Sequence, residues 1–177
     1  MRKLEAAAGN GSVPRRMAWP AWVSTICRFV LAGVWLWAGL AKVADPSTAV
    51  LAVQAYDIVP EVLVKPVAWG LPFMEIGLAA LLALGISTRI AAALSLTLFL
   101  AFIAGVGSAW ARGLQIECGC FGGGGADPAA TGLRYALEIA RDACFAAMAA
   151  WLIARAESYF ALGGRVLWQD QRPEVHD

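Results

Sequence analysis

The chain has 177 residues, of which 60% are apolar and only 15% are charged, against roughly 25% charged residues in an ordinary soluble domain. This excess of apolar surface indicates a lipid bilayer as the main partner. The net charge of +1 argues against nucleic acid. The single histidine, His176, lies next to the C-terminal residue, which argues against histidine-ligated haem or zinc and against a Ser-His-Asp hydrolase.

The two ends of the chain differ from its middle. Residues 1–20 are polar and small, which predicts a flexible N-terminal tail, and residues 156–177 predict a charged cytoplasmic C-terminal tail. The apolar run 21–43 follows the first tail, and it is longer than the roughly 7–15 apolar residues of a signal peptide. We therefore expect an uncleaved first membrane span.

Three further apolar runs follow the first, each close to the ~20 residues that a helix needs to cross the ~30 Å hydrocarbon layer. They cover residues 66–86, 90–111 and 133–154. Residues 48–55 predict a short amphipathic interfacial helix, with Pro60 and Pro66 ending it and starting the next element. The predicted fold is an all-α integral membrane protein, in which residues 21–155 form an antiparallel bundle of four transmembrane helices.

The basic residues predict the orientation of this bundle. Four spans place both termini on the same side as the turn at residues 87–89. Eight of the 14 Lys and Arg residues lie on that side, four on the other, and two inside the spans. Because cytoplasmic segments carry the excess of basic residues, we expect cytoplasmic termini in a bacterial inner membrane. The loop between the third and fourth spans is then extracytoplasmic, and so is the short helix.

That loop carries the motif Glu117-Cys118-Gly119-Cys120-Phe121-Gly122. Cysteines two positions apart form a disulfide only with an unusual backbone, which Gly119 permits because it has no Cβ. Such a small ring gains little loop-closure entropy, and strained, exposed disulfides are the easily reduced ones. We expect Cys118 and Cys120 to be an exposed catalytic pair. A loop-tightening bridge, two inert thiols, or a Cu(I) or zinc site shared with a partner are the alternatives.

Two further cysteines lie within the predicted spans. Cys27 falls in the first span and Cys144 in the fourth. Free cysteine is among the most buried residue types, so we expect both to be buried and inert.

Charged residues inside the spans are candidate functional residues, because charge is costly in lipid. They are Glu75, Glu138, Arg141 and Asp142, with Arg28 near the start of the first span. Glu138, Arg141 and Asp142 share one helix face. Matching depths predict an ion pair between Glu75 and Arg141, whereas Arg28 is expected to extend to the cytoplasmic headgroups. The group is interpreted either as a structural ion network or as a proton route and polar wall for a quinone.

The sequence resembles the MauE branch of the DoxX-like membrane proteins over roughly residues 24–155. The matching residues are Arg28, Ala32-Gly33, Ala38-Gly39-Leu40-Ala41-Lys42, Tyr56, Pro60, Leu71-Pro72, Glu75, Arg112-Gly113, Cys118-Gly119-Cys120-Phe121-Gly122 and Arg141-Asp142. The resemblance implies a four-helix protein of the bacterial cytoplasmic membrane that helps to form disulfides together with a thioredoxin-like partner. It also implies a link to quinone-reducing complexes.

Three functional hypotheses follow. The first is a thiol–disulfide redox protein, a thiol–disulfide oxidoreductase if it is an enzyme, which passes electrons between an extracytoplasmic protein and a membrane carrier such as quinone. The second is a non-catalytic anchor or assembly subunit of a redox or respiratory complex. The third and weakest is metal handling.

Overall fold

The computed structural model describes residues 18–155, which form five helices and two short strands. The elements are α1 (Ala18–Ala44), α2 (Pro46–Ala55), α3 (Glu61–Leu84), α4 (Thr88–Ala111), β1 (Ile116–Glu117), β2 (Gly125–Ala126) and α5 (Gly132–Ala154). The predicted tails lie almost entirely outside the described residues.

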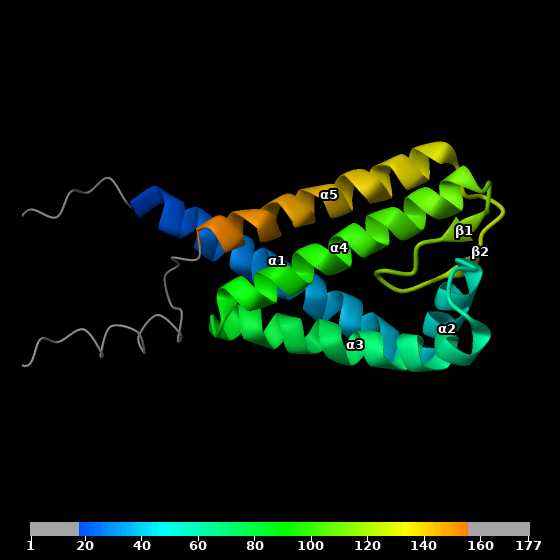
Figure 1. Ribbon diagram of the computed structural model, residues 1–177, viewed down its shortest axis with the longest axis horizontal. Coiled ribbons are helices and arrows are strands. Elements are labelled where there is room, and N and C mark those ends of the chain that lie inside the picture. The colour runs from blue at the N-terminus through cyan, green and yellow to red at the C-terminus, as the bar shows by residue number, and fades with distance from the viewer. Residues whose placement is uncertain (1–17, 156–177) are drawn as a thin grey trace, which may run out of the picture.

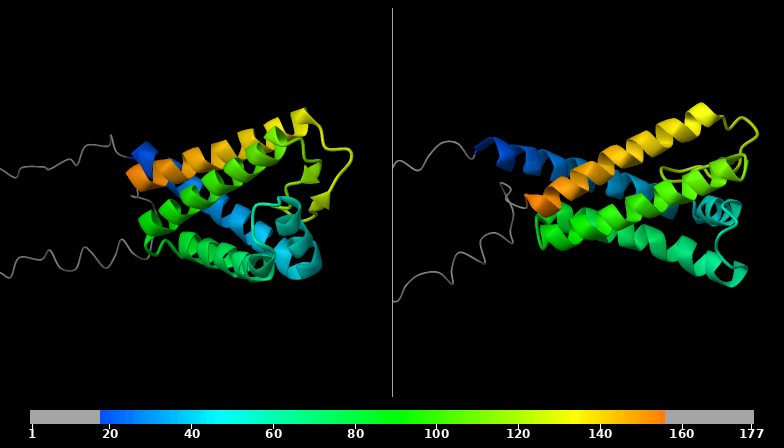
Figure 2. Two further views of the ribbon diagram at one scale, coloured as in Figure 1. Left: turned by 45° about the vertical axis from the view of Figure 1, so that its right-hand side comes forward. Right: turned by 45° about the horizontal axis from the view of Figure 1, so that its top comes forward.

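The four long helices lie side by side and alternate in direction (Figure 1). α1 packs mainly against α3, and α4 packs mainly against α5. Ser24 donates a hydrogen bond to the carbonyl of Arg155 at 2.7 Å, so the start of α1 and the end of α5 are adjacent. The α3–α4 turn lies at the same end, while α2, β1 and β2 lie at the opposite end (Figure 2). We call this opposite end the loop end.

Three helices in the described part of the chain, α1, α3 and α4, are long and apolar enough to cross a membrane. α5 has 23 residues, which is enough length at ~1.5 Å per residue. It also carries Arg134, Glu138, Arg141 and Asp142, and it does not reach the same apolar character. Its role as the fourth span stays a prediction.

The structure corrects the start of the second predicted span. α3 begins at Glu61, directly after Pro60, and it contains both Pro66 and Pro72. A proline disturbs the carbonyl four residues before it. For Pro66 that carbonyl belongs to Val62, in the first turn of α3, where one lost hydrogen bond does not end the helix.

The short helix between the first two long ones is present as α2. The side chain of Asp45 caps it by accepting a hydrogen bond from the backbone nitrogen of Thr48 at 3.1 Å, and Pro46 occupies the first turn, where its missing N–H costs nothing. α2 packs against α3 and β2. Its position at a membrane interface stays a prediction.

The core joins α1 to two of its neighbours. The indole of Trp35 donates to the hydroxyl of Ser95 on α4 at 2.9 Å and stacks on Phe99 at a centroid distance of 4.5 Å. On the α3 side, a Cβ built at Gly39 would lie 2.7 Å from Ile76 and 3.0 Å from the carbonyl oxygen of Pro72. The backbones therefore approach closely here, and residues one turn further along α1 face α3.

Candidate functional site

The cysteine loop connects α4 to α5 and is closed at its base by the two strands. Ile116 pairs with Ala126 and Glu117 with Gly125, so residues 118–124 form a loop that is closed by the two strands at the loop end. Gly119 and every glycine from 122 to 125 have positive φ, a conformation that favours glycine. The run of glycines is therefore required by the path of the backbone.

The loop packs on α2 at a single alanine. A Cβ built at Gly119 would lie 2.6 Å from the Cβ of Ala52, and one built at Gly124 would lie 2.4 Å from it. The methyl group of Ala52 thus sits between two glycines that have no space for a side chain. This contact sets how close the loop comes to α2.

Cys118 and Cys120 are both free thiols, and both are buried, with exposed fractions of 8% and 9%. They belong to an apolar cluster that also contains Val106 and Tyr135. The expectation of an exposed pair is wrong, because the loop folds back onto α2 and α4 instead of standing away from the bundle.

A buried lysine and glutamate lie directly beneath the loop. Lys42 Nζ lies 2.9 Å from Oε1 and 3.1 Å from Oε2 of Glu75, and both side chains are almost fully buried. The same ammonium donates to the carbonyl oxygens of Cys120 at 2.9 Å and of Ala38 at 3.3 Å. A lysine has three donors, and here they connect α1, α3 and the cysteine loop.

The predicted pair between Glu75 and Arg141 is therefore wrong. Glu75 is on α3, which packs mainly against α1, whereas α5 packs mainly against α4. Glu75 and Arg141 were matched by their depth along α3 and α5, but these two helices do not pack mainly against each other. Arg141 instead binds the adjacent Asp142, with Nε 3.0 Å from Oδ1, and its guanidinium lies 4.6 Å from the centre of the Phe121 ring in the loop.

The acidic residues of α5 lie next to the thiols. Both Glu138 and Asp142 act electrostatically on Cys118, and Asp142 also acts on Cys120. Within residues 18–155, Oε2 of Glu138 and Oδ2 of Asp142 are buried without a hydrogen-bond partner. The interpretation of these residues as a proton route stays a prediction.

Arg134 holds the two sides of the loop together. Its guanidinium lies 2.7 Å from Glu117, next to the first cysteine, 2.6 Å from Asp127 after β2, and 3.8 Å from Glu138 on its own helix. These groups are partly exposed, so each pair adds little stability by itself. Together they fix the base of the loop against α5.

Tyr56 contacts the first cysteine from the other side. Its hydroxyl donates to the carbonyl of Cys118 at 3.2 Å. A hydrogen bond from Cys120 lowers the pKa of the Cys118 thiol, burial opposes this, and Tyr56 adds to the lowering. The pKa of Cys120 is raised, because it donates that hydrogen bond and is buried. The first ionisation of the pair leaves one negative charge, which the hydrogen bond between the two sulfurs stabilises.

Three predicted residues lie away from this group. Arg28 is fully buried, with its guanidinium 4.8 Å from the ring of Phe29, so the prediction that it extends to the headgroups is wrong. It precedes Lys42 by 14 residues, about 21 Å along α1 at the usual helical rise. Cys27 is buried as expected, but Cys144 is exposed, because it faces away from the core.

A cavity of about 220 Å³ opens beside the thiols. Cys118, Cys120, Lys42 and Tyr56 line one part of it, and the rest of its wall consists almost entirely of apolar residues from α2, α3 and α4. It can take a compact apolar group in contact with both sulfur-bearing residues.

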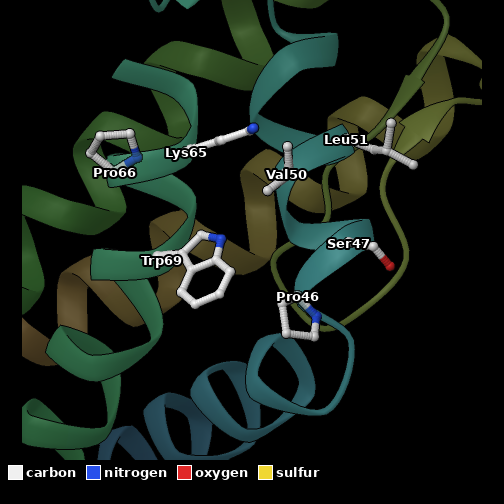
Figure 3. Close-up of a pocket in the computed structure, with 7 residues that line it drawn as sticks. All are labelled: Pro46, Ser47, Val50, Leu51, Lys65, Pro66 and Trp69. Carbon is white, nitrogen blue, oxygen red and sulfur yellow. The ribbon is translucent and has the colours of Figure 1, made fainter. Parts of the chain in front are cut away.

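A larger groove of about 750 Å³ lies between α2 and α3 (Figure 3). It is lined by Pro46, Ser47, Val50, Leu51, Lys65, Pro66 and Trp69. No thiol or acid lines it, in contrast to the smaller cavity. Among residues 18–155, no group of three or more His, Cys, Asp or Glu side chains is placed to hold a metal ion.

Three span-length apolar helices and a dithiol loop folded onto them define a helical membrane protein. The family model of methylamine utilisation protein MauE matches residues 20–155, so the chain belongs to the MauE family. Comparisons with curated proteins and with solved structures gave no match.

Sequence reasoning did not select Lys42, Tyr56 or Arg134 as site residues. Lys42 was counted as a charge at the end of a span, although its place one turn after Gly39 puts it on the face towards α3. Tyr56 appears in the sequence analysis only among the residues that carry the family resemblance, and Arg134 gave no signal, because their partners lie 62 and 17 residues away in the chain.

We expect Lys42→Met to destabilise the protein strongly. Removing one member of a buried ion pair leaves the other charge uncompensated and costs about 3–5 kcal/mol. Thermal unfolding in detergent measures the loss. Lys65→Met is the matched control, because Lys65 forms no ion pair within the described chain, and surface changes usually stay within about 0.5 kcal/mol. Equal unfolding temperatures for both variants would contradict a stabilising role for the pair.

Proposed function

We propose that this MauE-family protein is a membrane thiol–disulfide redox protein in which Cys118 and Cys120 are the exchanging pair. The observation that carries the proposal is the placement of both thiols at one end of a membrane-type bundle, between a hydroxyl donor and two carboxylates. The family name suggests a membrane role in methylamine utilisation.

The exchange with a protein partner has two steps. A thiolate of the partner attacks the oxidised Cys118–Cys120 pair, whose S–S bond breaks as a mixed disulfide forms. The second thiolate of the partner then displaces this chain, which leaves an oxidised partner and the reduced pair. A thioredoxin-like or other extracytoplasmic redox protein fits this chemistry. The loop must move off Ala52 for a folded partner to reach sulfurs that are less than 10% exposed.

Re-oxidation of the pair requires an acceptor for two electrons and two protons. A quinone supplies this capacity when bound, and the cavity of about 220 Å³ beside the thiols has the apolar walls that its ring needs. Lys42 and Tyr56 already donate to the carbonyls of Cys120 and Cys118, so they orient the pair in the cavity wall. The free oxygens of Glu138 and Asp142 accept the protons that leave the thiols.

We infer that α5 is the fourth span and that the loop end is extracytoplasmic, with α2 at the interface. The excess of basic residues on the side of both tails supports this orientation. The charges of α5 are compatible with a span, because they are paired with each other or with the loop and one of them, Asp142, is buried within the bundle.

The burial of both thiols also favours a second function. A non-catalytic anchor would use the loop as a fixed docking element, and sulfurs enclosed in an apolar cluster suit that role. The two functions differ in whether the sulfurs ever form a bond to another protein.

Single cysteines introduced at the two ends test the orientation. In a background without the four native cysteines (Cys27→Ala, Cys118→Ser, Cys120→Ser and Cys144→Ala), Ala129→Cys in the loop should react in intact cells with a membrane-impermeant maleimide. Ser87→Cys, in the opposite turn, should react only after the membrane is opened. The reverse pattern would place the loop end in the cytoplasm.

Cys118→Ser and Cys120→Ser should each abolish oxidation of the partner, because neither single thiol can form the internal disulfide. One of the two variants should accumulate a mixed disulfide, which non-reducing gel electrophoresis and mass spectrometry detect. Cys144→Ser, the control on the exposed face of α5, should behave as the unaltered protein. Full activity in both loop variants, or co-purification with a partner without any mixed disulfide, would support the anchor instead.

A larger side chain in the cavity of about 220 Å³ tests whether a quinone accepts electrons there. Ala101 and Ala104 are exposed alanines on α4, and only Ala101 lines the cavity. Ala101→Phe should slow re-oxidation of the reduced pair by a short-chain quinone at least tenfold, while Ala104→Phe should leave the rate unchanged. The rate is followed by the absorbance of the quinone. Equal rates in both variants would exclude the cavity as the site of electron transfer.

A further inference from the structure

Both the main-chain carbonyl and the side-chain hydroxyl of Tyr56 form hydrogen bonds to other segments of the chain. Its main-chain carbonyl accepts a hydrogen bond from the guanidinium of Arg112, the residue that ends α4, and Arg112 also reaches the carbonyl of Asp57 at 3.4 Å. Its ring lies against Gly105, where a Cβ would be 3.4 Å from the ring edge. The hydroxyl is thereby directed at Cys118.

The hydroxyl donates to the main-chain carbonyl of Cys118 at 3.2 Å, and it lies close enough to the thiol of the same residue to lower the pKa of that thiol. Burial raises the pKa of Tyr56, so the phenol stays protonated and remains a donor throughout the physiological range. The carbonyl of Cys120 is bound instead by Lys42. The two cysteines therefore differ in their environments although one residue separates them.

We propose that Tyr56 is a catalytic residue of the dithiol, which stabilises the thiolate of Cys118 by a hydrogen bond and makes Cys118 the first sulfur to react, and that Arg112 positions it. This deepens the proposed function, because it assigns the two thiols different roles. Cys118 forms and receives the bond to an outside sulfur, and Cys120 closes or releases the internal disulfide.

The charged groups around the pair do not by themselves favour Cys118. Glu138 and Asp142 both disfavour negative charge on Cys118, whereas the ammonium of Lys42 favours it on Cys120, and Arg141 acts on both thiols. A neutral donor within hydrogen-bond distance is therefore needed for Cys118 to ionise beside two carboxyl groups. Tyr56 supplies it from α2 without adding a charge to the apolar cluster.

Alkylation with iodoacetamide measures this directly, because the thiolate forms the S–C bond as iodide leaves. In full-length protein where Cys118 is the single cysteine (Cys27→Ala, Cys120→Ser, Cys144→Ala), Tyr56→Phe should move the pH profile of the rate to higher pH. The rate at neutral pH should fall about tenfold, as expected for loss of one hydrogen bond to a charged group. The midpoint of the profile reports ionisation and is independent of how open the loop is.

Tyr135→Phe is the matched control. Its hydroxyl lies in the same buried cluster but bonds the backbone of Leu114 and Ile116 and not a thiol, so the midpoint should not move. Arg112→Ala should shift the midpoint in the same direction as Tyr56→Phe, by less, and Arg112→Lys should restore part of it. An unchanged midpoint in Tyr56→Phe, or an equal shift in Tyr135→Phe, would overturn the proposal.

The experiments distinguish a failure of the role of Tyr56 from a failure of the proposed exchange function. A shifted midpoint together with no mixed disulfide would retain the role of Tyr56 in ionisation and reject exchange with a partner. In the protein with both cysteines, mass spectrometry should find Cys118 alkylated before Cys120, and Tyr56→Phe should reduce that preference. Prior modification of Cys120 would contradict the assignment of roles.

Discussion

The contact between Lys42 and Glu75 fixes the relation between the bundle and the cysteine loop. A charged pair in apolar surroundings is costly unless its donors are satisfied, and the carbonyl of Cys120 is one acceptor of the ammonium, beside the carboxylate of Glu75 and the carbonyl of Ala38. The close approach of α1 to α3 at Gly39 brings the two side chains together. The position of the loop and the packing of two helices therefore depend on each other.

In this arrangement the supporting contacts bind the main chain of the two cysteines and leave the sulfur atoms to react. The main chain at Cys118 and at Cys120 is bound through its carbonyls, by Tyr56 and Lys42, whereas both cysteines line the cavity. A change in the bonding of the sulfurs can therefore occur with little change in the supporting contacts. Access by another protein, in contrast, requires those contacts to be released.

The long helices could be predicted from the sequence, because the length of an apolar run is a local property. The thiol pair could be predicted from its spacing and its glycines. The partner of Glu75 could not, because depth along a helix gives no information about which helix is its neighbour, so Arg141 was chosen over Lys42. The exposure of Cys144 depends on which face of α5 meets α4, and the role of Tyr56 depends on a chain turn at Asp57.

The packing of the cysteine loop against Ala52 has a consequence for sequence variation within the family. Gly119 and Gly124 leave room for one methyl group and nothing larger, so these three positions form a single steric unit shared by two segments far apart in the chain. The positive φ of Gly119 and Gly124 restricts both positions to glycine whatever lies opposite them, so the loop offers no compensating change for a larger residue at Ala52. Aligned homologues should therefore keep a small residue at position 52 wherever both glycines are present, even where the surrounding residues have diverged.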